Sequence, residues 1–114
     1  MEMRIIRENV AFSEVSKMAE LQFGEMIKAV VDVDRKIMAL GGDLHADGEA
    51  LLLEDGSKQE NLWGINLYPG KSREEWIEFD SMINIRPSQG NRSRGVENER
   101  IRALIEEILG RIVQ

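Results

Sequence analysis

The chain has 114 residues, a net charge of −6 and no cysteine. This length suits one domain, residues 1–114, with a core of its own, and the absence of cysteine excludes disulfides, thiolate metal sites and a cysteine nucleophile. An acidic chain is a poor general nucleic-acid binder, because such binding depends on neutralising phosphates with Lys and Arg. No apolar run approaches the ~18 residues of a membrane span and the first residues lack a signal-like segment, so we expect a cytoplasmic protein.

The first elements that the sequence predicts are a short strand over residues 3–6 and a helix over residues 13–23. Ser13 is a suitable N-cap, and Gly24 suits the helix end. The residues at helical spacing that would form the buried stripe are Val15, Met18, Ala19 and Phe23.

Residues 27–33 are rich in β-branched side chains and residues 37–40 are apolar, which predicts two strands joined by a tight turn around Asp34. A single bent strand is the alternative. Asp32 and Asp34 would share a face on one strand and could then bind a divalent ion or share a proton. Asp favours turns, so the wet face and turn of a hairpin is the preferred interpretation.

The segment 43–49 contains the one histidine of the chain. In extended geometry Asp43, His45, Asp47 and Glu49 would lie on one face. One imidazole without a second nitrogen ligand is not typical of zinc, so we predict no metal or other cofactor here. If the segment is a catalytic site, His45 is its acid or base and Asp47 orients the imidazole.

The apolar run after this segment predicts a strand over residues 49–54, followed by a hairpin signal at Asp55-Gly56. Ser57 and Glu60 offer a capping box instead, and a short helix in this region stays open. Alternation then predicts a strand over residues 62–68 and another over residues 76–86, which Pro87 ends.

The stretch after residue 85 is a small basic region on an acidic chain: residues 86–114 carry six Arg and four Glu. Arginine forks and amide groups are typical of anion sites. The candidate ligand-binding residues are Asn66, Asn84, Arg86, Asn91, Arg92 and Arg94. The alternative is a connecting loop whose arginines pair with the protein's own acids.

The last helix is predicted from apolar residues at i, i+3, i+4, i+7 and i+11, starting at Ile101. Together these elements predict an α+β fold: a two-layer sandwich with a mostly antiparallel sheet of about five strands and the N- and C-terminal helices on one face. The second face of such a sheet would be wet or covered by a second subunit, which suggests a homodimer.

The run LHADGEALLLEDGSKQENLWGINLYP, followed by FDSMINIRPSQGNRS and a terminal helix, resembles a family of small prokaryotic proteins known only as a domain of unknown function. The resemblance extends from about residue 30 to the C-terminus and implies a single domain. It implies no activity and no catalytic residues.

Three functions follow from these observations. The first is a self-associating interaction domain, favoured by the acidic surface and the uncovered sheet face. The second is a small-anion or nucleotide-binding domain, or an enzyme, that uses the Arg86–Arg94 loop with His45 and Asp47. The third, a nucleic-acid-associated or toxin–antitoxin role, is supported only by the arginine loop.

Overall fold

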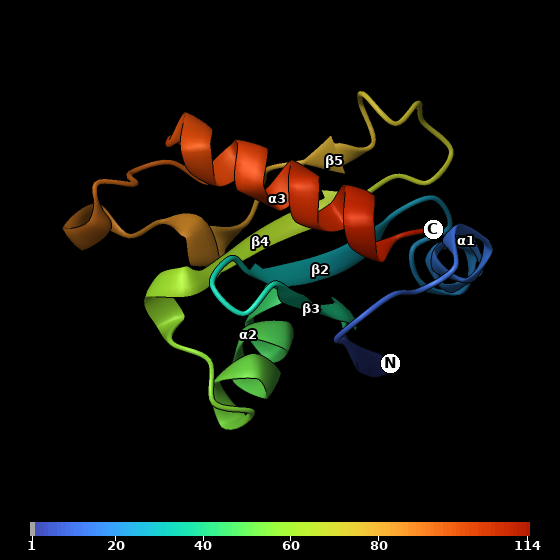
Figure 1. Ribbon diagram of the computed structural model, residues 1–114, viewed down its shortest axis with the longest axis horizontal. Coiled ribbons are helices and arrows are strands. Elements are labelled where there is room, and N and C mark those ends of the chain that lie inside the picture. The colour runs from blue at the N-terminus through green and yellow to red at the C-terminus, as the bar shows by residue number, and fades with distance from the viewer. Residues whose placement is uncertain (1) are drawn as a thin grey trace.

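A five-stranded antiparallel sheet is the scaffold of the computed structural model, which describes residues 2–114 (Figure 1). The spatial order of its strands is β1-β3-β2-β4-β5. The strands are β1 (Met3–Ile6), β2 (Ile27–Asp32), β3 (Ile37–Gly41), β4 (Leu62–Leu67) and β5 (Ile77–Glu78). The predicted α+β class with an antiparallel sheet is therefore confirmed.

Three α-helices and three short 3-10 helices complete the described part of the chain. The α-helices are α1 (Phe12–Gln22), α2 (His45–Glu54) and α3 (Glu99–Ile112), and the 3-10 helices are η1 (Gln59–Asn61), η2 (Met82–Asn84) and η3 (Pro87–Gln89). The N- and C-terminal helices were both predicted. Ser13 lies inside α1, whose N-cap is Ala11, and the N-cap of α3 is Asn98, whose Oδ1 accepts the N–H groups of Arg100 and Ile101.

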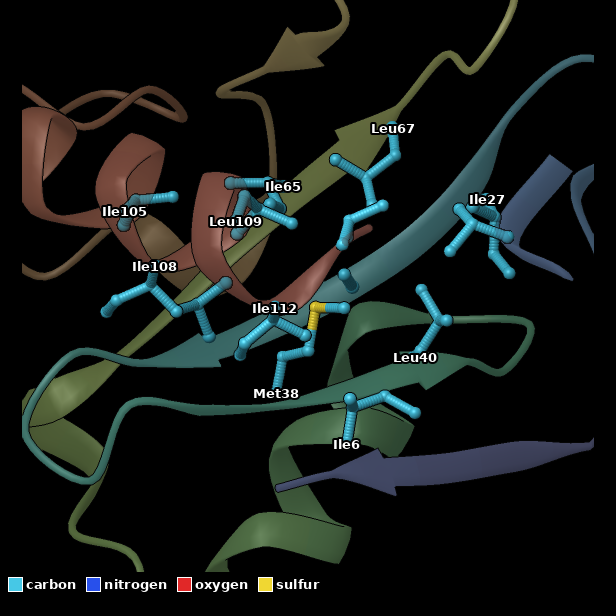
Figure 2. Packing of buried hydrophobic residues seen from close by; sticks show 14 of the residues in the cluster. Ile6, Ile27, Met38, Leu40, Ile65, Leu67, Ile105, Ile108, Leu109 and Ile112 are labelled. Atoms are coloured by element: carbon cyan, nitrogen blue, oxygen red, sulfur yellow. The ribbon is translucent and has the colours of Figure 1, made fainter. Parts of the chain in front are cut away.

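The main core lies between the sheet and these two helices. Figure 2 shows Ile105, Ile108, Leu109 and Ile112 of α3 directed at the side chains of the sheet, among them Met38 and Ile65. Val15 and Ala19 of α1 join the same cluster. Both helices therefore cover one face of the sheet, as their apolar periodicity predicted.

The second face of the sheet is covered in part by α2, where a strand over residues 49–54 was predicted. That prediction was wrong, and the helical alternative is correct. Leu52 of α2 is fully buried in a second cluster with Val30 and Ala39 of the sheet. A Cβ at Gly48 would lie 3.0 Å from Val30 Cγ2, so glycine allows the helix to pack this closely. A four-residue apolar run cannot separate a buried strand from a helix, which explains the error.

The hairpin between β2 and β3 confirms the prediction of two strands. Asp32 Oδ1 accepts the N–H groups of Asp34 and Arg35, both at 2.9 Å, and so holds the turn. Asp32 is buried whereas Asp34 is exposed, so the two carboxylates do not form a pair.

The predicted strand over residues 76–86 was also too long, because β5 contains only Ile77 and Glu78. The chain then leaves the sheet and forms η2 and η3. The alternation of apolar and polar residues in the sequence extends to Arg86. The residues after Glu78 nevertheless contact β4 through side-chain hydrogen bonds and not through the backbone hydrogen bonds of a strand.

We predict that Ile105→Ala lowers the free energy of unfolding by about 2–5 kcal/mol, because this side chain is fully buried against the sheet. Chemical denaturation measures the change. Glu106→Ala is the control, because Glu106 is exposed on the same helix. Equal, small losses in both variants would show that α3 does not pack through this face.

Candidate ligand pocket

The segment that follows β5 is fixed to β4 by the side chain of Asn84. Its Oδ1 accepts the Gly64 N–H at 2.8 Å, and its Nδ2 donates to the Gly64 carbonyl at 3.0 Å and to the Arg94 carbonyl at 2.9 Å. The side-chain amide thus supplies the donor and acceptor that a neighbouring strand would otherwise offer. Asn84 is fully buried, so these bonds satisfy backbone groups that water cannot reach.

Gly64 makes this contact possible. A Cβ at this position would lie 2.6 Å from both Cβ and Oγ of Ser81, and 3.1 Å from Cγ1 of Ile83. A glycine inside a strand often marks the close approach of another part of the chain, and here that part is the segment 81–84.

The guanidinium of Arg86, like the amide of Asn84, binds backbone groups of neighbouring segments. It donates to the carbonyls of Leu62, Gln59 and Ile83, and it stacks over the Trp63 ring with 4.3 Å from Cζ to the ring centroid. These donors are therefore used to fix the chain's own backbone, not to face a pocket.

The loop that follows is also held by its own side chains. Asn91 Nδ2 donates to the carbonyls of Asn84 and Gly95 at 2.7 and 2.8 Å, and its Oδ1 accepts the Glu97 N–H at 2.9 Å. The Glu97 carboxylate accepts the backbone N–H groups of Arg92 and then Ser93, which lowers the pKa of Glu97. The Arg92 side chain is exposed. Asn84 and Asn91 thus make their hydrogen bonds within the fold.

A pocket of about 570 Å³ lies where the N-terminus of α2, the sheet and the segment 80–83 meet. The predicted residues that line it are His45, Asn66 and Arg94. The structure brings these three together, whereas Asp47, Asn84, Arg86, Asn91 and Arg92 do not line the pocket. Its other lining residues are Met26, Lys28, Leu44, Ala46, Tyr68, Glu78, Asp80, Ser81, Met82 and Ile83.

A row of three polar residues crosses the sheet beneath this pocket. Asn66 of β4 lies directly opposite Lys28 of β2 on one side and Glu78 of β5 on the other, so the three side chains share a face. Asn66 Nδ2 donates to Glu78 Oε1 at 2.8 Å and to the Asp80 carbonyl at 3.2 Å. These two bonds fix the orientation of the amide and turn Oδ1 away from β5.

Asn66 is only 5% exposed, and its side-chain oxygen Oδ1 is buried without a hydrogen-bond partner. Four buried side-chain atoms in residues 2–114 lack a partner, and Asn66 Oδ1 is the one whose residue lines this pocket. A buried acceptor left unpaired costs about 1–3 kcal/mol of stability. Less than 1 Å² of this oxygen is accessible, so this cost concerns the fold and not a ligand in the pocket.

His45 begins α2 and lies almost buried at the pocket wall. Its Nε2 lies 2.8 Å from the Ile65 carbonyl, which can only accept, so Nε2 carries the proton. Burial lowers the pKa of His45 and the Lys28 charge lowers it further, whereas the Ile65 carbonyl, the nearby side-chain amide of Asn66 and the Asp80 charge oppose this shift. The imidazole is therefore neutral near pH 7. Its orientation comes from Ile65 rather than from Asp47, which instead accepts the Leu44 N–H at 3.2 Å.

Arg94 and Asp80 form the outer wall, with 2.6 Å between Nε and Oδ1. Glu78 Oε1 accepts bonds from Asn66 and from the Tyr68 hydroxyl. Lys28 lies near the Phe23 ring, with Nζ 5.5 Å from the centroid, and in residues 2–114 it makes no ion pair. Lys28 is thus the charged group of the pocket floor that is free to recognise a ligand.

Sequence reasoning missed Lys28, Tyr68, Glu78 and Asp80. The signal for Lys28 was present, because it is the single charge in the apolar run 27–31. Glu78 and Asp80 lie on the polar side of the alternating segment 76–86, where solvated carboxylates are typical.

The described residues 2–114 contain no group of three or more His, Asp or Glu side chains placed to hold a metal ion. Within the same range, no helix combines the length and the apolar character needed to cross a membrane.

The fold and pocket define a small α+β domain with a polar cavity beside its sheet. The chain belongs to the family described as Protein of unknown function (DUF5674), whose model matches residues 4–112. The resemblance to a family of unknown function is therefore confirmed. No curated protein and no solved structure matches the chain significantly.

We predict that Gly64→Ala lowers the free energy of unfolding by about 1–3 kcal/mol, because the new methyl group would overlap Ser81. Gly70→Ala is the matched control, because a Cβ there meets nothing within 4 Å. Denaturant melts of both variants measure the difference. A Gly64 variant as stable as the Gly70 variant would contradict the close docking of segment 81–84.

We also predict that His45 titrates below 6.5, which NMR can follow cleanly because the chain has one histidine. Since the folded pKa is lower than the unfolded value, the unfolded chain binds more protons in this range. Stability from neutral His45 is complete above pH 6.5 and is lost as the pH falls toward the folded pKa. A measured pKa at or above 6.5 would contradict the buried, neutral imidazole.

Proposed function

We propose that this protein binds a small organic anion, and that the site is the pocket lined by Lys28, His45, Asn66 and Arg94. The observation that carries the proposal is the Lys28 ammonium, which lines a cavity of about 570 Å³ and makes no ion pair in residues 2–114. Pockets of this size with a few convergent polar groups are typical ligand sites.

The anion is supported by the charges that face the cavity. The Lys28 ammonium has no carboxylate partner in residues 2–114, and the guanidinium of Arg94 is bound to Asp80 through Nε. The carboxylates of Glu78 and Asp80 already accept hydrogen bonds from neighbours. A ligand anion would therefore interact with Lys28 and Arg94, while Glu78 and Asp80 keep their hydrogen bonds to neighbouring side chains.

Binding rather than catalysis is the function we propose. His45 Nε2 donates to a backbone carbonyl, and Asp47 lies outside the pocket, so the pair does not form the acid–base arrangement expected from the sequence. The neutral imidazole instead forms part of a wall beside the unpaired amide oxygen.

A thermal-shift screen against small carboxylates, hydroxy acids, phosphorylated metabolites and nucleotides tests the proposal. A compound at 100 times its dissociation constant adds about 2.7 kcal/mol of stability. We predict that the shift is lost in Arg94→Ala and kept in Arg92→Ala, a matched control because both arginines are exposed in one loop and only Arg94 lines the pocket. No shift with any compound, or equal shifts in both variants, would refute the site.

Self-association is a second candidate, supported by the exposed apolar side chains of Leu44 and Met82 at the pocket mouth, which are 60% and 65% exposed. The first reason for expecting a homodimer was an uncovered sheet face, and α2 now covers part of that face. Sedimentation velocity over a range of concentrations tests this candidate. A nucleic-acid role has less support, because Arg86 and Arg94 are bound within the chain.

A further inference from the structure

We infer that the ligand is a free α-amino acid with an apolar side chain, bound through both its carboxylate and its ammonium group. This inference rests on the proposed function, because the carboxylate is the anionic group that binds, and it names the ligand class of the same pocket. Three features carry it: an unpaired cation, a carboxylate whose charge no cation balances, and an apolar mouth.

The unpaired cation is Lys28, which lies on one side of Asn66 in the row of polar residues across the sheet. Its side chain is half-buried beside the cavity, and its ammonium makes no ion pair in residues 2–114. A half-buried ammonium gains more from a carboxylate than an exposed one, because the effective dielectric constant around it is lower than that of water. The ligand carboxylate therefore belongs at this end of the row.

The unbalanced carboxylate is Glu78, which lies at the other end of the row. Its two hydrogen bonds come from uncharged donors, Asn66 Nδ2 and the Tyr68 hydroxyl, and both reach Oε1. No Lys or Arg in the described part of the chain forms an ion pair with Glu78. A carboxylate can accept about four hydrogen bonds, so Oε2 can bind a ligand ammonium while Oε1 keeps its present donors.

The other two charged side chains of the pocket balance each other. Arg94 Nε lies 2.6 Å from Asp80 Oδ1 at the outer wall. Lys28 and Glu78 are thus the two charges of the pocket that no ion pair within residues 2–114 compensates. A ligand with only a negative charge would neutralise Lys28 and leave Glu78 unbalanced, whereas a zwitterion neutralises both.

The spacing of the two charges favours a short zwitterion. Lys28 and Glu78 stand on the same face of the sheet on strands β2 and β5, with β4 between them, so their backbones are about 10 Å apart. Two charge-assisted hydrogen bonds of about 2.8 Å each take up more than half of this spacing. The ammonium and carboxylate of the ligand must therefore be close together, as they are on the Cα of an α-amino acid.

The apolar mouth selects the side chain of the ligand. Leu44, Met82 and Met26 line the pocket, and the first two are more than half exposed. A leucine, methionine or phenylalanine side chain would remove part of this apolar surface from water. Methionine adapts well to varied apolar partners. A volume of about 570 Å³ is typical of small-molecule sites and admits any of these amino acids whole.

Calorimetry on the wild-type protein with leucine, methionine and phenylalanine tests the ligand class. The tightest binder is then compared with three analogues: the acid without the amino group, the N-acetyl amino acid and the amino-acid amide. We expect each analogue to bind at least tenfold more weakly, because each lacks one of the two charges. Failure of all three amino acids to bind, or equal binding of any analogue, would overturn the inference.

A comparison of leucine with its isomer 6-aminohexanoate tests the spacing, because the isomer carries the same two charges farther apart. We expect the isomer to bind at least tenfold more weakly than leucine. Equal or tighter binding of 6-aminohexanoate would overturn the assignment to an α-amino acid.

The variants Glu78→Gln and Glu75→Gln locate the ammonium. Glutamine at position 78 keeps an acceptor for Asn66 and Tyr68 and removes only the charge. We expect Glu78→Gln to weaken the tightest amino acid about tenfold and to leave its analogue without the amino group bound as well as before. Glu75→Gln is the control, because Glu75 is exposed and does not line the pocket. Equal effects in both variants, or equal losses for both compounds, would overturn the inference.

The variants Lys28→Gln and Lys17→Gln locate the carboxylate. We expect Lys28→Gln to weaken both the amino acid and its analogue about tenfold, and Lys17→Gln to change neither, because Lys17 is exposed and does not line the pocket. Equal effects of the two lysine variants would overturn the inference. If carboxylates without an ammonium stabilise the protein through Arg94 as well as amino acids do, the inference falls and the proposed function stands. If no anion of any class stabilises the protein, both fall.

Discussion

The side-chain amide of Asn84 against the peptide of Gly64 is the interaction on which the rest of this structure depends. Strand β4 pairs with β5 over only two residues, so the remaining backbone groups on that edge need other partners. The side-chain amide of Asn84 hydrogen-bonds the N–H and carbonyl of Gly64, and the Arg86 guanidinium donates to the Leu62 carbonyl. Because an unpaired buried backbone group is costly, two polar side chains here take the place of a strand.

The replacement of a strand by these two side chains also creates the pocket. Where a full strand would have continued the sheet, the chain from Asp80 to Ile83 stands beside it and becomes a wall. Asn84 also holds the carbonyl of Arg94, which places that guanidinium at the rim beside Asp80. The opposite wall comes from α2, whose close packing through Gly48 brings His45 beside Asn66. The architecture therefore leaves a polar cavity with one amide oxygen unpaired.

Much of the fold could be predicted from the sequence, because β2, β3, β4, α1 and α3 have clear apolar periodicity. The early end of strand β5 after Glu78 and the choice of helix over strand for α2 could not. The alternation from Trp76 to Arg86 is real, yet Asn84 and Arg86 point their polar groups at backbone rather than solvent. Of the candidate site residues, the pocket brings together His45, Asn66 and Arg94. It adds Lys28, which is 38 positions from Asn66 in the sequence but lies directly opposite it on the neighbouring strand. Only the strand register reveals this proximity.

The central claim is that the pocket beside Asn66 receives a small organic anion between Lys28 and Arg94. A titration of ¹⁵N-labelled protein with the compound of the thermal-shift screen that stabilises it most, followed by two-dimensional NMR, tests this most directly. The expected shifts involve the side-chain amide of Asn66 and the backbone around Lys28, His45 and Met82, while the exposed face of α3 stays unchanged. An unchanged Asn66 amide, or shifts that centre on another part of the molecule, would contradict the claim.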